Sequence, residues 1–148
     1  MSITVPKNSS DYESNLKTLK AIHHSQCLFN CNPPVPDFRL WFDDGGILFG
    51  EFTCTQDHQG YNGVAHGGLV AAIIDSSMVQ CLMGHGVVGY TTDLSIKYRK
   101  PIVILQPTSL KIEITEIILS CLYNIKCEIS QNQNLVVEAT GKFLKAME

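Results

Sequence analysis

Residues 60–84, GYNGVAHGGLVAAIIDSSMVQCLMG, decide the fold that we predict for this chain. They begin with turn-forming residues, pass through His66-Gly67-Gly68 and continue as a long apolar segment with one carboxylate, Asp75. Apolar side chains cover nearly the whole circumference of a helix from about residue 66 or 67 to about residue 83, which is typical of a helix buried on all sides. A carboxylate in such a helix is costly unless it is paired or hydrogen-bonded. Asp75 therefore indicates a functional site.

The composition excludes several classes of protein. The 148 residues suffice for one domain with a real core, and a net charge of -3 gives no basic surface for nucleic acid. Asp75, His66 and Gln80 interrupt the most apolar stretch, which argues against a membrane span. The N-terminal sequence MSITVPKNSSDYES lacks the apolar region of a secretory signal. We expect a single cytoplasmic domain over residues 1–148, with neither a nucleic-acid nor a membrane partner.

Six cysteines raise the question of disulfides or a metal. The chain is not small and shows no export signal, so buried free thiols are the favoured interpretation. Cys27 and Cys31 have a spacing that can bind zinc, and His23 and His24 lie just upstream. No second cysteine pair follows at a finger-like distance, so we expect no metal there. A redox role for Cys27 and Cys31 is left open.

The N-terminal part predicts a short disordered segment and then a helix. Residues 1–9 are expected to be disordered. Ser10-Asp-Tyr-Glu13 has the capping-box pattern, and apolar residues follow at helical spacing, so a helix is expected over about residues 10–24. The proline-rich run Asn32-Pro-Pro-Val-Pro36 then blocks a helix and forms a stiff connector.

Alternating apolar and polar residues predict strands on both sides of the apolar helix. Two strands precede it, joined at the turn signal Asp43-Asp-Gly-Gly46, and four follow it. The expected strands span about residues 38–42, 47–55, 90–98, 110–115, 123–129 and 135–143. Short polar turns separate the last strands, so sequential neighbours should pair antiparallel. The predicted architecture is α+β, with about six antiparallel strands curling around one long central helix.

The central residues resemble those of the hotdog-fold thioesterases, specifically the PaaI-type (phenylacetate-pathway-like) group. The resemblance rests on Gln59-Gly-Tyr-Asn-Gly-Val-Ala-His-Gly-Gly68, on Asp75 seven residues later and on Thr91-Thr-Asp-Leu-Ser-Ile-Lys-Tyr-Arg-Lys-Pro101. An upstream segment with Cys27, Cys31 and Asn-Pro is also similar, so the resemblance covers roughly residue 27 to the C-terminus. It implies a hotdog fold, a homodimer or dimer of dimers, and hydrolysis of acyl-CoA thioesters without a metal or other cofactor; coenzyme A is part of the substrate.

Thioester hydrolysis needs a donor for the carbonyl oxygen and a base or nucleophile for the carbon. A helix N-terminus offers unpaired N–H groups, and the missing side chain of Gly67 lets a substrate approach. Asp75 is the candidate that activates water or attacks directly. The resemblance implies that Thr91 holds the water and that the backbone around His66 and Gly67 polarises the carbonyl. The structural alternatives are that His66 only caps the helix, that Asp75 is an interface carboxylate and that Thr91 is an ordinary strand residue.

Further residues are expected to contact the substrate, because they lie beside the glycines or at the end of the threonine-containing strand. They are Gly68, Asn62, Gln59, Thr92, Arg99 and Lys100, of which the last two could meet the phosphates of coenzyme A. Many members of the group carry Asn or Gln six residues before the His, where this chain has Gly60. This departure motivates an alternative function, an acyl-CoA-binding module that does not hydrolyse its ligand.

The spacing of His66 and Asp75 predicts a site shared between two chains. Nine residues correspond to about 13.5 Å along a helix and place the two on opposite sides of it. Catalytic groups must lie within about 3 Å of the reacting atoms, so one chain cannot supply both to one carbonyl. If both act together, Asp75 comes from a second copy, and a two-fold dimer then has two identical sites.

Overall fold

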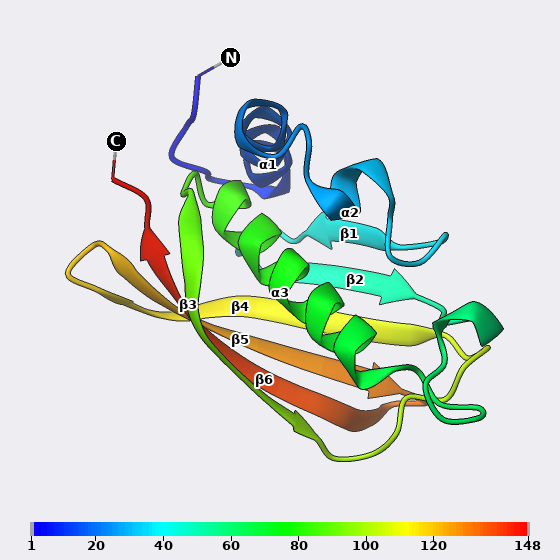
Figure 1. Ribbon diagram of the computed structural model, residues 1–148. Coiled ribbons are helices and arrows are strands. Elements are labelled where there is room, and N and C mark those ends of the chain that lie inside the picture. The colour runs from blue at the N-terminus through cyan, green and yellow to red at the C-terminus, as the bar shows by residue number, and fades with distance from the viewer. Residues whose placement is uncertain (1, 148) are drawn as a thin grey trace.

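In the computed structural model, which describes residues 2–147, a six-stranded antiparallel sheet curves around one long helix, α3 (Figure 1). The helices are α1 (Ser9–His23), α2 (Leu28–Cys31) and α3 (Gly67–Gly84), with a short 3-10 helix, η1, at Gln56–His58. The strands are β1 (Arg39–Phe42), β2 (Leu48–Phe52), β3 (Gly89–Tyr98), β4 (Thr108–Ile118), β5 (Leu122–Gln131) and β6 (Asn134–Lys145). This is the α+β architecture predicted from the sequence, with its central helix within a residue of the expected bounds.

The strand order is β1-β2-β4-β5-β6-β3, and every neighbouring pair is antiparallel. β4, β5 and β6 pair sequentially, as predicted. β3 does not pair with β4 but lies at the far edge of the sheet beside β6, so the expectation of sequential neighbours is wrong for this strand. The linker between β3 and β4 is the reason: Lys100 donates to the Val136 carbonyl, and Ala65 donates to the Ile102 carbonyl. The chain therefore crosses the end of the sheet before β4 begins beside β2.

α3 fills the concave face of the sheet, and α1 packs beside it (Figure 1). Its sheet-facing side chains, Ile73, Ile74, Met78 and Leu82, are completely buried. Another side of α3, which includes Asp75 and Ser76, is only half-buried. The prediction that this helix is buried on all sides is therefore wrong there, because the sheet and α1 together do not surround it.

α3 is also long and apolar enough to cross a membrane by length and composition alone, and half of it is buried inside the protein. A helix that is half-buried between the sheet and α1 is placed like the core helix of a folded domain.

The start of the chain differs from the expectation. α1 is capped by Asn8, whose side chain accepts a hydrogen bond from the Asp11 amide, rather than by Ser10. Glu13 does not complete a capping box, because its carboxylate accepts from the Phe42 amide at 2.9 Å. Residues 2–8 form neither helix nor strand, yet Thr4 is held through three hydrogen bonds to the buried side chain of Asn15. Residue 1 of the segment expected to be disordered lies outside the described residues.

Candidate active site

The N-terminus of α3 presents an open backbone donor. His66 is the N-cap residue, and its Nδ1 accepts a hydrogen bond from the Gly68 amide at 2.9 Å. The amide of His66 itself donates to the His58 carbonyl at 2.8 Å. Within residues 2–147 the amide of Gly67 has no hydrogen-bond partner, and Gly67 is exposed. An N–H at the positive end of an 18-residue helix is well suited to binding a developing oxyanion.

Packing does not require glycine at position 67. A Cβ there would approach nothing closer than the Tyr98 ring at 3.7 Å, which is an ordinary contact. The hydroxyl of Tyr98 donates to the Gly67 carbonyl at 2.7 Å and so fixes this turn of the helix. Partial burial raises the pKa of Tyr98, which keeps that donor protonated. The open space above Gly67 is therefore available to a ligand.

Asp75 and Thr91 come together on the partly exposed side of α3. The Thr91 hydroxyl on β3 donates to Asp75 Oδ1 at 2.7 Å, so the carboxylate is hydrogen-bonded, as its position required. A β-bulge lies between Thr91 and Asp93, and the extra residue, Thr92, donates to the Lys142 carbonyl at 3.0 Å. Bulges re-aim side chains next to functional sites. Here the bulge directly follows Thr91, whose hydroxyl is hydrogen-bonded to the Asp75 carboxylate.

The structure brings Asp75 to Thr91 but not to the open end of the helix. His66 precedes the first residue of α3, and Asp75 is the ninth residue of the helix. At about 1.5 Å per residue they are separated by about 13.5 Å along the axis and by half a turn around it. Within one protomer, Asp75 and the open end of the helix are therefore far apart, and whether a second copy joins them stays a prediction.

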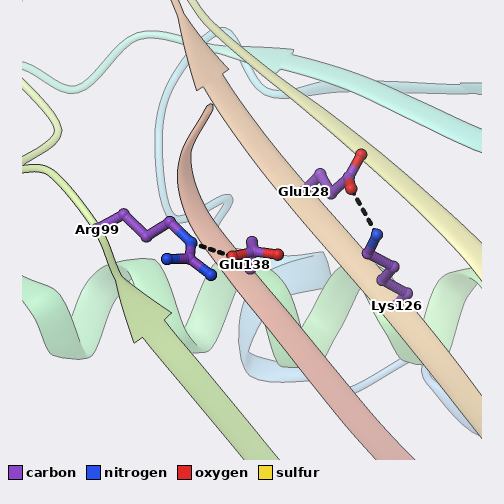
Figure 2. A network of polar contacts seen from close by, with 4 residues as sticks. All are labelled: Arg99, Lys126, Glu128 and Glu138. Carbon is purple, nitrogen blue, oxygen red and sulfur yellow. Dashed lines mark hydrogen bonds and ion pairs between the residues drawn. The ribbon is translucent and has the colours of Figure 1, made fainter. Parts of the chain in front are cut away.

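A pocket of about 270 Å³ adjoins the N-terminus of α3. Gly67, Tyr61, Tyr98, Arg99 and Lys100 contribute to its lining. Arg99 is ion-paired with Glu138 of β6, whereas Lys100 is exposed and has no ion pair within the described chain (Figure 2).

Figure 2 also shows a second ion pair, Lys126 to Glu128 at 2.6 Å, on the neighbouring strand β5. Glu138 thus belongs to a charged patch on the sheet, and its ion pair with Arg99 already engages that guanidinium group.

Tyr98 and Tyr61 were not among the site residues predicted from the sequence. A signal for Tyr98 was present, because it continues the alternation of Leu94 and Ile96 and therefore lies on the helix-facing side of β3. Nothing in the pattern around Tyr61 distinguishes it from an ordinary loop residue, although 87% of its surface is exposed.

The loop before α3 uses most of its polar side chains for its own structure. Gln59 Oε1 accepts from the Gly63 amide at 3.0 Å, and His58 Nδ1 accepts from the Thr55 amide at 2.8 Å. Asn62 is exposed, and its side chain has no partner within residues 2–147. A Cβ at Gly60 would lie 3.2 Å from His66 Cδ2, so a longer side chain there would project beside His66. Gly60 thus leaves open the position where the related group carries an amide.

The cysteines are all free, as expected. Cys54, Cys81 and Cys127 are buried, and burial raises the pKa of the Cys81 and Cys127 thiols to about 12. Cys27, Cys31 and Cys121 are only partly buried or exposed, so the prediction of buried thiols is wrong for these three. Residues 2–147 contain no group of three or more His, Cys, Asp or Glu side chains placed to hold a metal ion.

Comparison with known proteins identifies what this chain is similar to. The sequence profile of the thioesterase superfamily matches residues 62–118. The mouse protein named acyl-coenzyme A thioesterase THEM4 is 35% identical over 92 residues, which are 59% of this chain and 38% of the mouse protein. The matched segment is thus well under half the length of the curated relatives.

Two solved structures show the fold. The E. coli PaaI protein from the phenylacetic acid degradation operon has a TM-score of 0.75 at 13% identity, covering 92% of this chain and 96% of that chain. A hypothetical thioesterase from Streptococcus pneumoniae TIGR4, solved with coenzyme A, has a TM-score of 0.68 at 19% identity, covering 75% and 90% of the two chains. These similarities confirm the predicted hotdog fold.

Proposed function

We propose that the chain is a member of the thioesterase superfamily, whose profile matches residues 62–118, and that it hydrolyses acyl-CoA thioesters to the free acid and coenzyme A. The observation that carries the proposal is the unpaired Gly67 amide at the exposed N-terminus of α3, beside a pocket lined by Lys100. The Asp75 carboxylate, hydrogen-bonded to Thr91, supplies the second chemical group on the same helix.

The reaction uses these groups in a fixed order. The Gly67 N–H donates to the thioester carbonyl oxygen, and such a preorganised donor is typically worth about 3 kcal/mol in the transition state. Asp75 accepts a proton from water as the water oxygen attacks the carbonyl carbon, and Thr91 holds that water and the carboxylate in place. The C–S bond then breaks and coenzyme A leaves as the thiolate. In the alternative route, Asp75 attacks the carbon itself, the C–S bond breaks as coenzyme A leaves as the thiolate, and water then hydrolyses the resulting anhydride.

The site is completed by a second copy of the chain. His66 and Gly67 come from one protomer and Asp75 from its partner, because about 13.5 Å separates them along one helix. The free edge of β3, opposite its pairing with β6, carries unpaired backbone groups and offers a surface on which a partner can pair. We propose a homodimer, or a dimer of dimers, with two identical sites.

The remaining expectations concern the surroundings of the site. Lys100 at the pocket is the cation best placed for the coenzyme A phosphates, and Arg99 joins it if it leaves Glu138. Asn62 and Gly68 lie near the open helix end, whereas Gln59 and Thr92 already have intramolecular partners.

We further propose that hydrolysis needs no metal or cofactor, that the protein is cytoplasmic and that it has neither nucleic-acid nor membrane partners. We expect that treating the protein with a chelator leaves its turnover of acyl-CoA unchanged.

Substitution of Asp75 tests the mechanism. Asp75→Ala and Asp75→Asn should abolish hydrolysis of a panel of acyl-CoAs, measured as thiol release, because the base or nucleophile is lost. Light scattering should show the same assembly as for the wild-type protein, since Asp75 is half-buried and its carboxylate accepts a hydrogen bond from the Thr91 hydroxyl. Turnover of purified Asp75→Ala close to wild type would rule this mechanism out.

A second candidate function is an acyl-CoA-binding module without hydrolytic activity. Gly60 favours it, because the amide found there in the related group is absent, and Gln59 and His58 are committed to the loop. The same acyl-CoA panel separates the two functions. Tight binding of acyl-CoA without any release of thiol would favour the binding module.

A further inference from the structure

A second pocket, of about 450 Å³, lies between α1, the α2–β1 segment and α3. Its apolar lining comes from Leu16, Phe29, Phe38 and Leu40, together with two prolines. α3 contributes Ser76 and Gln80. Ser76 directly follows Asp75 in the helix, and their side chains point about 100° apart around its axis.

A chain of polar groups crosses the pocket. Lys20 Nζ on α1 donates to Gln80 Oε1 at 3.1 Å, and Gln80 Nε2 donates to Ser76 Oγ at 3.4 Å. Within residues 2–147 no carboxylate lies within ion-pair distance of Lys20. Burial lowers the pKa of Lys20, which is the effect of taking an ammonium group out of water. A neutral amide oxygen is therefore the partner of a half-buried cation.

The other charges of the pocket do not neutralise Lys20. Glu13 lines the pocket, but its carboxylate accepts a hydrogen bond from the Phe42 amide. Lys17 also lines it and is exposed. Two lysines and one carboxylate leave a net positive charge in a pocket that combines these polar groups with an apolar wall. Such a pocket suits a ligand with an apolar stem and an anionic end.

We infer that this pocket receives the acyl group of the substrate and that Lys20 binds a carboxylate at its far end, so that the substrates are CoA esters of dicarboxylic acids. The inference rests on the proposed function. In the proposed dimer the pocket belongs to the protomer that supplies Asp75, whereas the coenzyme A lies on the protomer that supplies Gly67. Gln80 is five residues beyond Asp75, about 7.5 Å along the helix and about 140° around it, so an acyl chain of medium length that follows the helix surface from Asp75 reaches Gln80.

The test compares two esters of equal chain length, adipyl-CoA and hexanoyl-CoA, which differ in the terminal carboxylate. The wild-type protein should have the higher kcat/KM for adipyl-CoA. Lys20→Met should lower that value by about 10- to 100-fold, the usual effect of losing a hydrogen bond to a charged group, and leave hexanoyl-CoA nearly unchanged. Lys20→Arg should retain most of the adipyl-CoA activity. Lys145→Met, on an exposed residue at the end of β6, is the matched control and should change neither value.

Binding of non-hydrolysable thioether analogues of the two esters separates this inference from the proposed function. Tighter binding of the adipyl analogue, lost in Lys20→Met with an unchanged melting temperature, supports the inference even if no ester is hydrolysed. Equal affinities of the two analogues for the wild-type protein would overturn it. An equal loss for both analogues in Lys20→Met would also overturn it. Absence of hydrolysis of every ester would contradict only the proposed function.

Discussion

The hydroxyl of Thr91 is the group that orients the Asp75 carboxylate, through a hydrogen bond of 2.7 Å. We predict that Thr91→Val lowers kcat by about 10- to 100-fold, because a hydrogen bond to a charged group is worth about 1.5–3 kcal/mol. Thr91→Ser keeps the hydroxyl and should keep most of the activity. Steady-state hydrolysis of one acyl-CoA by the three proteins is the measurement.

Thr140→Val is the matched control for Thr91, since Thr140 is an exposed residue of β6 whose side chain faces away from α3. It should leave kcat unchanged. If Thr91→Val turned over like the wild-type protein, Thr91 would be an ordinary strand residue, and Asp75 would act without its help.

Single residues also show where inference from the sequence ends. Asp75 was predicted to be functional because a carboxylate in an apolar helix requires a partner; the structure shows the partner, and the function stays a prediction. The sequence pattern cannot tell whether a polar residue in a loop faces a ligand or its own backbone. Gln59 is the example: its side chain closes the turn at Gly63. Its neighbour Asn62 has the same chemistry and remains exposed.

At the scale of elements, the junction of α3 and β1 depends on close packing at Gly84. A Cβ on Gly84 would lie 2.2 Å from the Phe42 ring, and Gly84 and Phe42 are both buried. We predict that Gly84→Ala lowers the free energy of unfolding by about 1–3 kcal/mol, because the ring has to move within a filled core. Urea unfolding followed by circular dichroism measures the change.

Gly45→Ala is the comparison for this glycine. Gly45 is exposed in the β1–β2 turn, and a Cβ there meets only the Asp43 side chain, at 3.4 Å. Its effect should stay within about 0.5 kcal/mol. Equal stability of Gly84→Ala and the wild-type protein would show that Phe42 has room to move.

Elements were predictable to different degrees, for physical reasons. Strands β4, β5 and β6 follow from alternation, because one of their faces is buried against α3 and the other faces water. β3 was predicted as a strand, but alternation does not say which neighbour a strand pairs with. Its place beside β6 depends on where residues 99–107 cross the sheet end, through contacts such as that from Ala65 to Ile102. Such long-range hydrogen bonds leave no periodic signal.

At the scale of the whole molecule, the proposed dimer makes activity a property of the assembly, because each of its sites takes groups from two protomers. We predict that two inactive variants complement each other: Asp75→Ala removes the base, and Gly67→Val covers the open amide while meeting only the Tyr98 ring nearby. Each homodimer then lacks one group in both of its sites and should be inactive. A heterodimer has one site with both defects and one site with neither.

Heterodimers purified through two different affinity tags should therefore recover about half of the wild-type activity. Heterodimers of Asp75→Ala with Asp75→Asn, prepared in the same way, should remain inactive, which excludes recovery through tagging or assembly alone. An inactive mixed dimer of normal size and stability would mean that Gly67 and Asp75 do not meet across the two-fold axis. Because about 13.5 Å separates His66 from Asp75 along one helix, that result would remove one of the two groups from the reaction. A restored site, in contrast, would require that the carbonyl polarised by one protomer is attacked from the other.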